Sequence, residues 1–264
     1  MLYLNGHAVP VTMFPDNTSQ VWKLPVNILP PKTNKLIARY ADIKWDYSDE
    51  GEFLQLAQLK DLLDEHGILV ELTLTYLPYG RQDKEIDNFS TFALRTFAKL
   101  LNSLNFHNIH INDPHSQIAL DLIKNSYAIY PIQEVENVII QTKSDMICYP
   151  DNGASEKYRE VYNRKLPRLH GEKIRDQLTG NIISYKLLGD PSNKNVLIVD
   201  DICDGGATFK ILAKDLLAAG AKSVVLFVTH GIFSKGTRTL FESGIQRVFT
   251  KDGEVSERTG SLQF

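Results

Sequence analysis

The sequence predicts an α/β protein of two tandem domains, each built on a mainly parallel sheet flanked by helices. Strand-like apolar runs alternate with helix-like stretches in both halves of the chain. Polar clusters follow several of the expected strands, as in parallel sheets that bind ligands at the carboxyl ends of their strands. We expect the domains to span residues 1–133 and 134–264, with residues 131–142 as their connector.

The expected elements of the first half follow one another along the chain. Apolar residues recur at helical spacing after Ser48 and again after Asn88, which predicts amphipathic helices ending near His66 and Leu104. Runs rich in Val, Ile, Leu and Thr predict strands between and after these helices. Strands and turns are expected at residues 1–25, 43–47, 69–77, 105–112 and 127–130, a short helix at 117–124, and a weakly helical stretch at 28–39.

The second half repeats the alternation. Strands are expected at residues 146–149, 182–188, 196–201, 223–229 and 247–250, and helices at 152–161, at 209–219 and from about 235. Residues 166–170 have a short and ambiguous pattern, and residues 173–181 have no strand pattern.

Composition excludes several classes of protein. Of 264 residues, 43% are hydrophobic and 23% are charged, and the formal net charge is −3. This charge gives no reason to expect nucleic acid or a membrane as a partner. No apolar run is long enough for a membrane span and no secretory leader is visible, so we expect a cytoplasmic enzyme. Two cysteines, Cys148 and Cys203, do not make a disulfide framework or a metal cluster, and Cys203 is expected to be a packing residue.

The most informative stretch is Val196–Thr208, with the sequence VLIVDDICDGGAT. A buried strand is expected to end at the paired carboxylates of Asp200 and Asp201, followed by a glycine-rich turn and a helix. Unpaired N–H groups and the positive end of the helix dipole attract anions at such a helix start. Glycines also occur in ordinary turns between strand and helix. The flanking acids favour a site in which the loop holds a phosphate and the acids hold sugar hydroxyls.

Three more polar clusters follow expected strands, at residues 81–84, 113–117 and 151–154. Taken alone, Arg81 and Lys84 are typical of a solvated loop, and His115 is typical of an ordinary histidine at a strand end. Their meaning therefore depends on the motifs to which they belong.

The glycine-rich stretch and the Pro-Tyr-Gly-Arg-Gln-Asp at residues 78–83 together closely resemble ribose-phosphate diphosphokinases, also called phosphoribosyl diphosphate synthetases. The resemblance extends in the same order over most of the chain and implies two phosphoribosyltransferase-like domains. It implies transfer of the β,γ-diphosphoryl group of ATP to the anomeric hydroxyl of ribose 5-phosphate, giving phosphoribosyl diphosphate and AMP. It also implies Mg²⁺ as cofactor, ATP and a ribose phosphate as ligands, and a homo-oligomer, either dimer or hexamer.

The resemblance also implies roles for the residues that match the family's motifs. Lys173 and Arg175, which otherwise belong to a merely charged stretch, match a catalytic flexible loop, and Asp151 and His115 match metal ligands. The implied nucleotide-binding residues are Phe14, Asp16, Arg81, Gln82, Asp83 and His115. The implied ribose-phosphate-binding residues are Asp200, Asp201, Asp204, Gly205, Gly206, Ala207 and Thr208.

The match departs from the family at the phosphate loop. The family's Asp-Thr-Gly-Gly-Thr is replaced by Asp-Gly-Gly-Ala-Thr at residues 204–208, and Gly205 is expected to open the distal side of the pocket. The acceptor can therefore be ribose 5-phosphate or a larger 5-substituted ribose such as ADP-ribose. A non-catalytic regulatory homologue is a further alternative, which Lys173 and Arg175 argue against. A phosphoribosyltransferase that consumes the activated sugar is disfavoured by the whole first domain.

Overall fold

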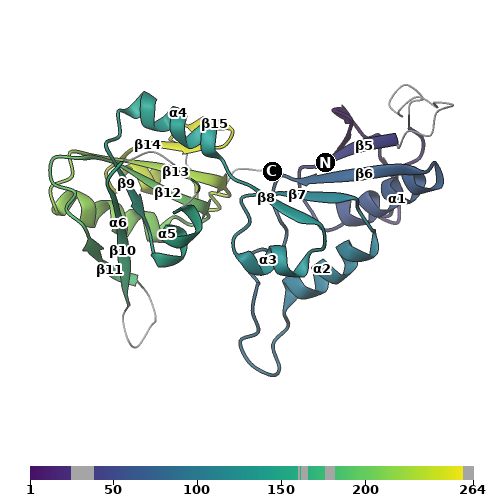
Figure 1. Cartoon of the computed structure of the whole chain (residues 1–264), viewed down its shortest axis with the longest axis horizontal. Coiled ribbons are helices and arrows are strands. Elements are labelled where there is room, and N and C mark those ends of the chain that lie inside the picture. The colour runs from purple at the N-terminus through teal and green to yellow at the C-terminus, as the bar shows by residue number, and fades with distance from the viewer. Residues whose placement is uncertain (25–38, 160, 162–165, 176–181, 258–264) are drawn as a thin grey trace. The chain divides into compact units, whose positions relative to one another are not determined.

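The computed structural model describes residues 1–24, 39–159, 161, 166–175 and 182–257. Residues 28–38, most of the stretch expected to be weakly helical, lie outside this part. The chain divides into two compact units, Met1–Ile129 and Tyr130–Phe264. Each unit contains a mainly parallel sheet flanked by helices, as the sequence predicted (Figure 1). Within the described residues, no helix is long and apolar enough to cross a membrane.

The first unit is built on a six-stranded sheet in the order β2-β1-β5-β6-β7-β8. Strands β5 to β8 run parallel to one another, and β1 joins β5 antiparallel. The strands are β1 (Leu2–Leu4), β2 (His7–Ala8), β5 (Arg39–Trp45), β6 (Ile68–Leu74), β7 (Asn108–Asn112) and β8 (Ser126–Ile129). A separate hairpin joins β3 (Thr12–Met13) to β4 (Ser19–Gln20).

Three helices supply the apolar residues that cover the first sheet, namely α1 (Glu52–Glu65), α2 (Ala93–Ser103) and α3 (Gln117–Leu122). Alternate strand residues such as Ile43, Leu72 and Ile111 are fully buried in the same cluster as these helices. The intervening residues are polar or exposed, so the strands show the two-residue alternation of a half-buried sheet.

Helix α2 begins later than the sequence pattern suggested, at Ala93 instead of residues 88–90. The hydroxyl oxygen of Ser90 accepts hydrogen bonds from the N–H groups of Ile86 and Asp87, at 2.7 and 2.9 Å. These local bonds compete with helix formation. From the helical spacing, Leu100 was expected on the apolar face of this helix, but Leu100 is exposed and Leu94 is buried.

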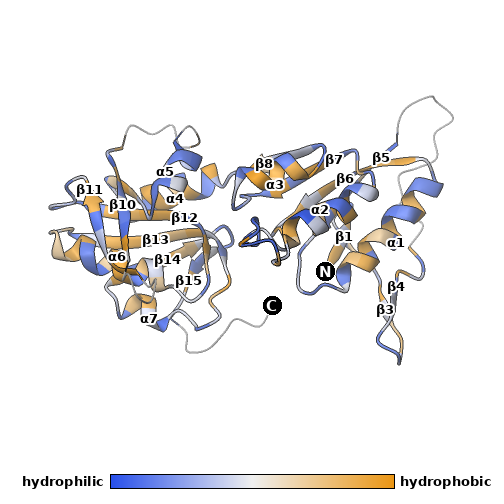
Figure 2. Ribbon diagram, turned by 90° about the horizontal axis from the view of Figure 1, so that it is seen from below, coloured by the Kyte–Doolittle hydropathy of each residue, from blue (hydrophilic) through white to orange (hydrophobic). Residues whose placement is uncertain are grey.

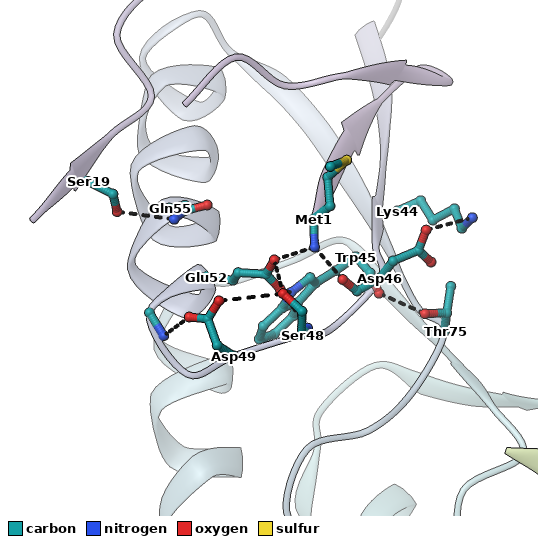
Figure 3. A network of polar contacts seen from close by, with 11 residues as sticks. Met1, Ser19, Lys44, Trp45, Asp46, Ser48, Asp49, Glu52, Gln55 and Thr75 are labelled. Atoms are coloured by element: carbon teal, nitrogen blue, oxygen red, sulfur yellow. Dashed lines mark hydrogen bonds and ion pairs between the residues drawn. The ribbon is translucent and has the colours of Figure 1, made fainter. Parts of the chain in front are cut away.

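A buried carboxylate, Glu52, organises the start of α1 (Figure 3). It accepts hydrogen bonds from the indole N–H of Trp45 at 2.8 Å and from the hydroxyl of Ser48 at 2.7 Å, and it pairs with the amino group of Met1. Burial alone would raise the pKa of Glu52, but these partners outweigh burial and lower it. Glu52 therefore joins strand β5, helix α1 and residue 1 as a carboxylate anion.

The second unit is built on a seven-stranded sheet in the order β11-β10-β9-β12-β13-β14-β15. Its strands are β9 (Met146–Tyr149), β10 (Arg168–Arg175), β11 (Ile182–Leu188), β12 (Asn195–Cys203), β13 (Ser223–Gly231), β14 (Ile245–Thr250) and β15 (Gly253–Val255). Strands β10, β9, β12, β13 and β14 are parallel, and β11 and β15 are antiparallel edge strands.

Helices cover both faces of the second sheet, which explains why its central strands contain uninterrupted apolar runs, Val196–Val199 in β12 and Val224–Val228 in β13 (Figure 2). Residues of α6 (Ala207–Ala218) and α7 (Arg238–Phe241) share one buried cluster with Val196 and Ile198. Residues of α4 (Ile132–Thr142) and α5 (Asn152–Tyr158) share the other with Leu197 and Val199.

Two expectations about the second half were wrong. Residues 132–142 are not a plain connector but form α4, whose Val135, Val138 and Ile139 are buried at helical spacing against the second sheet. Residues 168–175 form a full strand, which the sequence did not predict because charged residues interrupt its alternation of apolar and polar positions. In that strand Leu169 and Gly171 are buried while Glu172 is exposed, which is the alternation of a strand with one buried face.

Candidate functional site

Asp151 lies where strand β9 turns into helix α5. It is the N-cap of α5, and its Oδ1 atom accepts a hydrogen bond of 2.9 Å from the N–H of Ala154. The Pro-Asp-Asn-Gly sequence after β9 thus places a carboxylate at the carboxyl end of a parallel strand.

Lys173 reaches this carboxylate from strand β10. Its Nζ atom is 2.5 Å from Oδ2 of Asp151. Lys173 lies in regular antiparallel pairing with Tyr185 of β11, so it belongs to a strand and not to the flexible loop implied by the resemblance. Arg175 ends the same strand, paired with Ile182, and its side chain is outside the described part of the chain.

Asp200 and Asp201 occupy the end of strand β12, next to β9 in the sheet. Successive strand residues point to opposite faces, so Asp200 shares the face of α6 and Asp201 shares the face of α5. Lys157 of α5 lies 3.4 Å from Asp201, with both side chains largely buried. The N–H of Asp201 also donates to Oδ1 of Asp200 at 3.0 Å.

The three acids differ in their preferred protonation state. Burial, and then the charge of Asp201, raise the pKa of Asp200 well above its usual value. Burial also disfavours the charged form of Asp151, but hydrogen bonds from Lys173 and from the N–H of Ala154 outweigh it and lower its pKa. The charges of Asp151 and Asp201 are therefore each paired with a lysine, while the environment of Asp200 favours its neutral form.

The glycine-rich loop connects β12 to α6 as predicted. Gly206 has φ +72°, and a Cβ atom there would lie 2.8 Å from Cδ2 of Leu240, so this position needs glycine. Ala207 and Thr208 form the first turn of α6, where free N–H groups point out of the helix. The hydroxyl of Ser234, in the loop after β13, donates a hydrogen bond to Asp204.

Three side chains at this edge were not found by sequence reasoning. Lys157 pairs with Asp201. The nearest methylene group of Lys235 lies 3.5 Å from the point that a Cβ atom of Gly205 would occupy. Tyr185 is buried beside Gly171. None belongs to a recognisable motif, because their proximity arises only from the folding of distant strands and helices. Cys203, by contrast, is fully buried, and burial raises its pKa to about 12, as expected of a packing residue.

The expected nucleotide residues of the first unit follow strands β6 and β7, which are neighbours. Arg81 and Gln82 have exposed side chains in the turn after β6, and Asp83 is partly buried. Two hydrogen bonds fix the backbone of Gln82. Its N–H donates to the carbonyl of Tyr79 at 2.9 Å, and its carbonyl accepts from the N–H of Leu94 at 3.2 Å. His115 is exposed in the turn between β7 and α3, so the same sheet edge carries both clusters.

Phe14 and Asp16 lie in the β3–β4 hairpin. Asp16 accepts hydrogen bonds from the hydroxyl and the N–H of Thr18, at 2.7 and 3.1 Å, and these bonds lower its pKa. Asp16 thus closes the turn, and Phe14 is 37% exposed. Gln58 of α1 anchors the hairpin by accepting from the N–H of Val21 and donating to the carbonyl of Ser19.

The chemistry of the acids in the second unit suits Mg²⁺, which prefers oxygen ligands. Burial, and then the charges of Asp201 and Asp151, raise the pKa of Asp200, and a divalent cation would relieve the repulsion among these acids. Within the described residues, no group of three or more His, Cys, Asp or Glu side chains is arranged to hold a metal alone. A metal there would therefore need further oxygens, such as those of phosphate groups.

Comparison with known proteins agrees with this arrangement. A family model described as the phosphoribosyl transferase domain matches residues 155–258. A ribose-phosphate pyrophosphokinase of Pyrococcus abyssi is 29% identical over 198 residues, which are 72% of this chain and 67% of the relative. One of Pyrococcus furiosus is 28% identical over 233 residues, 86% of this chain and 79% of the relative.

The fold of the whole chain has a counterpart among solved structures. A crystal structure of phosphoribosylpyrophosphate synthetase from Mycobacterium smegmatis superposes with a TM-score of 0.70 at 19% identity, covering 92% of this chain and 79% of that one. The sequence relatives, the matched domain and this two-unit fold agree, and the chain is similar over most of its length to ribose-phosphate pyrophosphokinases.

Proposed function

We propose that the protein transfers the β,γ-diphosphoryl group of ATP to the anomeric hydroxyl of ribose 5-phosphate, with AMP as the second product. The observation that carries this proposal is the contact of 2.5 Å between Lys173 and Asp151. It joins the lysine of the catalytic motif to an acidic sheet edge that also carries Asp200 and the glycine-rich loop. The similarity to ribose-phosphate pyrophosphokinases supports the same class of reaction.

The proposed reaction forms one bond and breaks one. The anomeric oxygen bonds to the β-phosphorus of ATP, the bond from that phosphorus to the oxygen of AMP breaks, and the hydroxyl proton is released. Asp200 and Asp201 accept hydrogen bonds from the ribose 2- and 3-hydroxyls, and the N–H groups of residues 204–208 bind the 5-phosphate. Such a transfer depends on positioning and on neutralising charge.

Lys173 and Arg175 supply positive charge at the point where negative charge develops on the transferring group. Mg²⁺, held by Asp151 and phosphate oxygens, would neutralise the polyphosphate charge. His115, in the first unit, is proposed separately as a residue that can bind a metal or the nucleotide. In the first unit, the proposed nucleotide-binding residues are Phe14, Asp16, Arg81, Gln82, Asp83 and His115. We also propose a homo-oligomer, which light scattering after size-exclusion chromatography would test.

A larger acceptor is the second candidate, and the environment of Gly205 favours it. A Cβ atom there would meet nothing closer than a methylene of Lys235 at 3.5 Å, which is an ordinary contact. The Nζ atom of Lys235 lies only 4.0 Å from the same point. A second phosphate, as in ADP-ribose, would find both room and a positive charge on this side of the loop.

A coupled assay of AMP release tests the proposal, with ribose 5-phosphate and ADP-ribose as parallel acceptors. Lys173→Ala is expected to reduce the rate by about 10²–10³ while ATP binding persists. Lys186→Ala is the matched control, because Lys186 lies in the neighbouring strand and forms an exposed pair of 3.6 Å with Glu172. Its rate is expected to stay within about twofold of wild type.

The outcomes separate the candidates. AMP release with ribose 5-phosphate supports the first acceptor, and release only with ADP-ribose supports the second. No AMP release with either acceptor would refute the enzymatic proposal and favour a regulatory homologue. An unchanged rate in Lys173→Ala would remove Lys173 from the reaction.

A further inference from the structure

The segment that follows strand β13 is folded onto the glycine-rich loop. The N–H groups of Ile232 and Phe233 both donate to the carbonyl of Cys203, at 2.9 and 3.1 Å. The hydroxyl of the next residue, Ser234, donates to the carboxylate of Asp204. Hydrogen bonds from consecutive residues therefore hold this segment against the beginning of the glycine-rich loop.

Packing fixes the same segment. The side chain of Phe233 is fully buried, and its ring fills the space beside Gly231, where a Cβ atom would lie 2.1 Å from Cε2 of the ring. The N–H of Gly236 donates to the carbonyl of Phe233 at 2.8 Å and closes the turn that contains Lys235. Lys235 has an exposed side chain, but it is carried by a turn whose backbone is held in place.

The side chain of Lys235 extends along Gly205 of the glycine-rich loop. The point that a Cβ atom of Gly205 would occupy lies 3.5 Å from Cδ, 3.7 Å from Cε and 4.0 Å from Nζ of Lys235. Gly205 is not among the glycines with positive φ, so its backbone conformation does not require glycine. What glycine provides at this position is the absence of a side chain, which leaves the space beside the loop to the lysine.

Lys235 differs from two other lysines of this sheet edge in its partners. Lys157 pairs with Asp201, and Lys173 pairs with Asp151. Within the described residues, Lys235 has no acid at ion-pair distance and its ammonium group makes no hydrogen bond. An ammonium group held beside a row of backbone N–H groups, with its charge uncompensated by an acid, suits an anion that binds to the same loop.

We propose that Lys235 binds the phosphate on the 5-position of the acceptor, as a substrate-binding residue supplied by the segment after β13. This inference rests on the proposed function, which places that phosphate on the N–H groups of residues 204–208. The ammonium group donates a charge-assisted hydrogen bond to a phosphate oxygen on the side of Gly205, where the loop itself has no side chain. A hydrogen bond of this kind, made by an exposed lysine, corresponds to about 10-fold in binding.

Lys235→Met removes the charge and keeps a long unbranched side chain, and Lys222→Met is its matched control. Lys222 is also exposed, but it precedes β13 while Lys235 follows it, so the two lysines lie at opposite ends of one strand. Binding of ribose 5-phosphate and of ADP-ribose to the full chain is measured by calorimetry. The assay of AMP release supplies kcat and the KM values for acceptor and ATP.

For each acceptor that wild type binds, Lys235→Met is expected to raise the dissociation constant and the KM about 10-fold, with kcat and the KM for ATP little changed. The loss should shrink as salt is added, because the charge of Lys235 is exposed and is screened. Lys222→Met should bind and react as wild type does. Both variants should unfold at the wild-type urea concentration, because both lysines are exposed.

Three results would overturn the role of Lys235 and leave the proposed transfer standing. Unchanged acceptor binding in Lys235→Met would remove the residue from the phosphate site. A raised KM for ATP alone would assign it to the nucleotide. A loss confined to ADP-ribose, with ribose 5-phosphate bound as in wild type, would assign it to the second phosphate of that acceptor.

Failure of the proposed function gives a different pattern. If wild type binds an acceptor but releases no AMP, the transfer is refuted, and weaker calorimetric binding in Lys235→Met still supports the phosphate contact. If wild type binds neither acceptor, both proposals are overturned.

Discussion

Replacing Gly206 by alanine should disrupt the glycine-rich loop, whereas the same change at Gly205 should not. Gly206 has φ +72°, and a left-handed backbone costs a residue with a Cβ atom about 1–2 kcal/mol. The added methyl would also lie 2.8 Å from Cδ2 of Leu240, which is 1% exposed, and such overpacking costs about 1–3 kcal/mol. We therefore expect Gly206→Ala to lower the free energy of unfolding of the second unit by about 2–5 kcal/mol.

Gly205 is the matched control because it lies one residue away in the same loop. It is not among the residues with positive φ, and its added Cβ would meet Lys235 at an ordinary distance of 3.5 Å. We expect Gly205→Ala to change stability by no more than about 0.5 kcal/mol.

Urea unfolding followed by two probes resolves the two units. Trp22 and Trp45 are the two tryptophans of the chain, and both lie in the first unit, so tryptophan fluorescence reports that unit. Far-ultraviolet circular dichroism reports both. Gly206→Ala should shift the dichroism transition to lower urea and leave the fluorescence transition in place. Equal destabilisation by the two substitutions, or none by Gly206→Ala, would contradict the geometry on which this prediction is based.

Three further predictions concern charged groups. Glu52→Gln should destabilise the first unit by about 1–3 kcal/mol at pH 7, measured by tryptophan fluorescence in urea. Because the pKa of Glu52 is lowered in the fold from 4.5, wild type keeps this contribution above about pH 4.5 and loses it as pH falls through the folded pKa. Asp200→Asn should stabilise the ligand-free second unit by about 0.5–2 kcal/mol and weaken calorimetric ribose 5-phosphate binding. Since the folded pKa of Asp200 is raised, this gain should be absent in acid and grow as pH rises through that pKa. Lys173→Ala should tighten Mg²⁺ binding in the presence of an ATP analogue that cannot transfer its diphosphoryl group, measured by calorimetry.

The sequence predicted the alternation of elements and the position of the acidic edge, because both depend on local patterns. Val196–Val199 is an apolar run that reads as a strand buried on both faces, and all four residues are buried in the structure. The same reasoning did not predict the strand that contains Lys173, because charged residues lie on both sides of Gly171 and interrupt the apolar pattern. Glycine and lysine disfavour a strand locally, and this strand exists because it pairs with β9 and β11.

Contacts between distant segments could not be predicted in this way. The pair between Lys157 and Asp201 joins residues 44 positions apart, and the hydrogen bond from Tyr185 to Asp215 spans 30 positions. Neither follows from a spacing rule, because the packing of helices α5 and α6 on opposite faces of the sheet creates both.

The pair between Lys173 and Asp151 couples the proposed metal to the proposed chemistry. Oδ2 of Asp151 lies 2.5 Å from the ammonium group, and Oδ1 accepts the N–H of Ala154, so a metal ion bound there would compete with Lys173 for the same carboxylate. If Asp151 held a metal ion, the ammonium group of Lys173 would lose this partner and would be available to the transferring phosphoryl group. Removing the competitor should therefore strengthen Mg²⁺ binding in Lys173→Ala by severalfold, although transfer is lost. Lys186→Ala should not change Mg²⁺ binding, and weaker binding in Lys173→Ala would show that Asp151 is not the metal ligand.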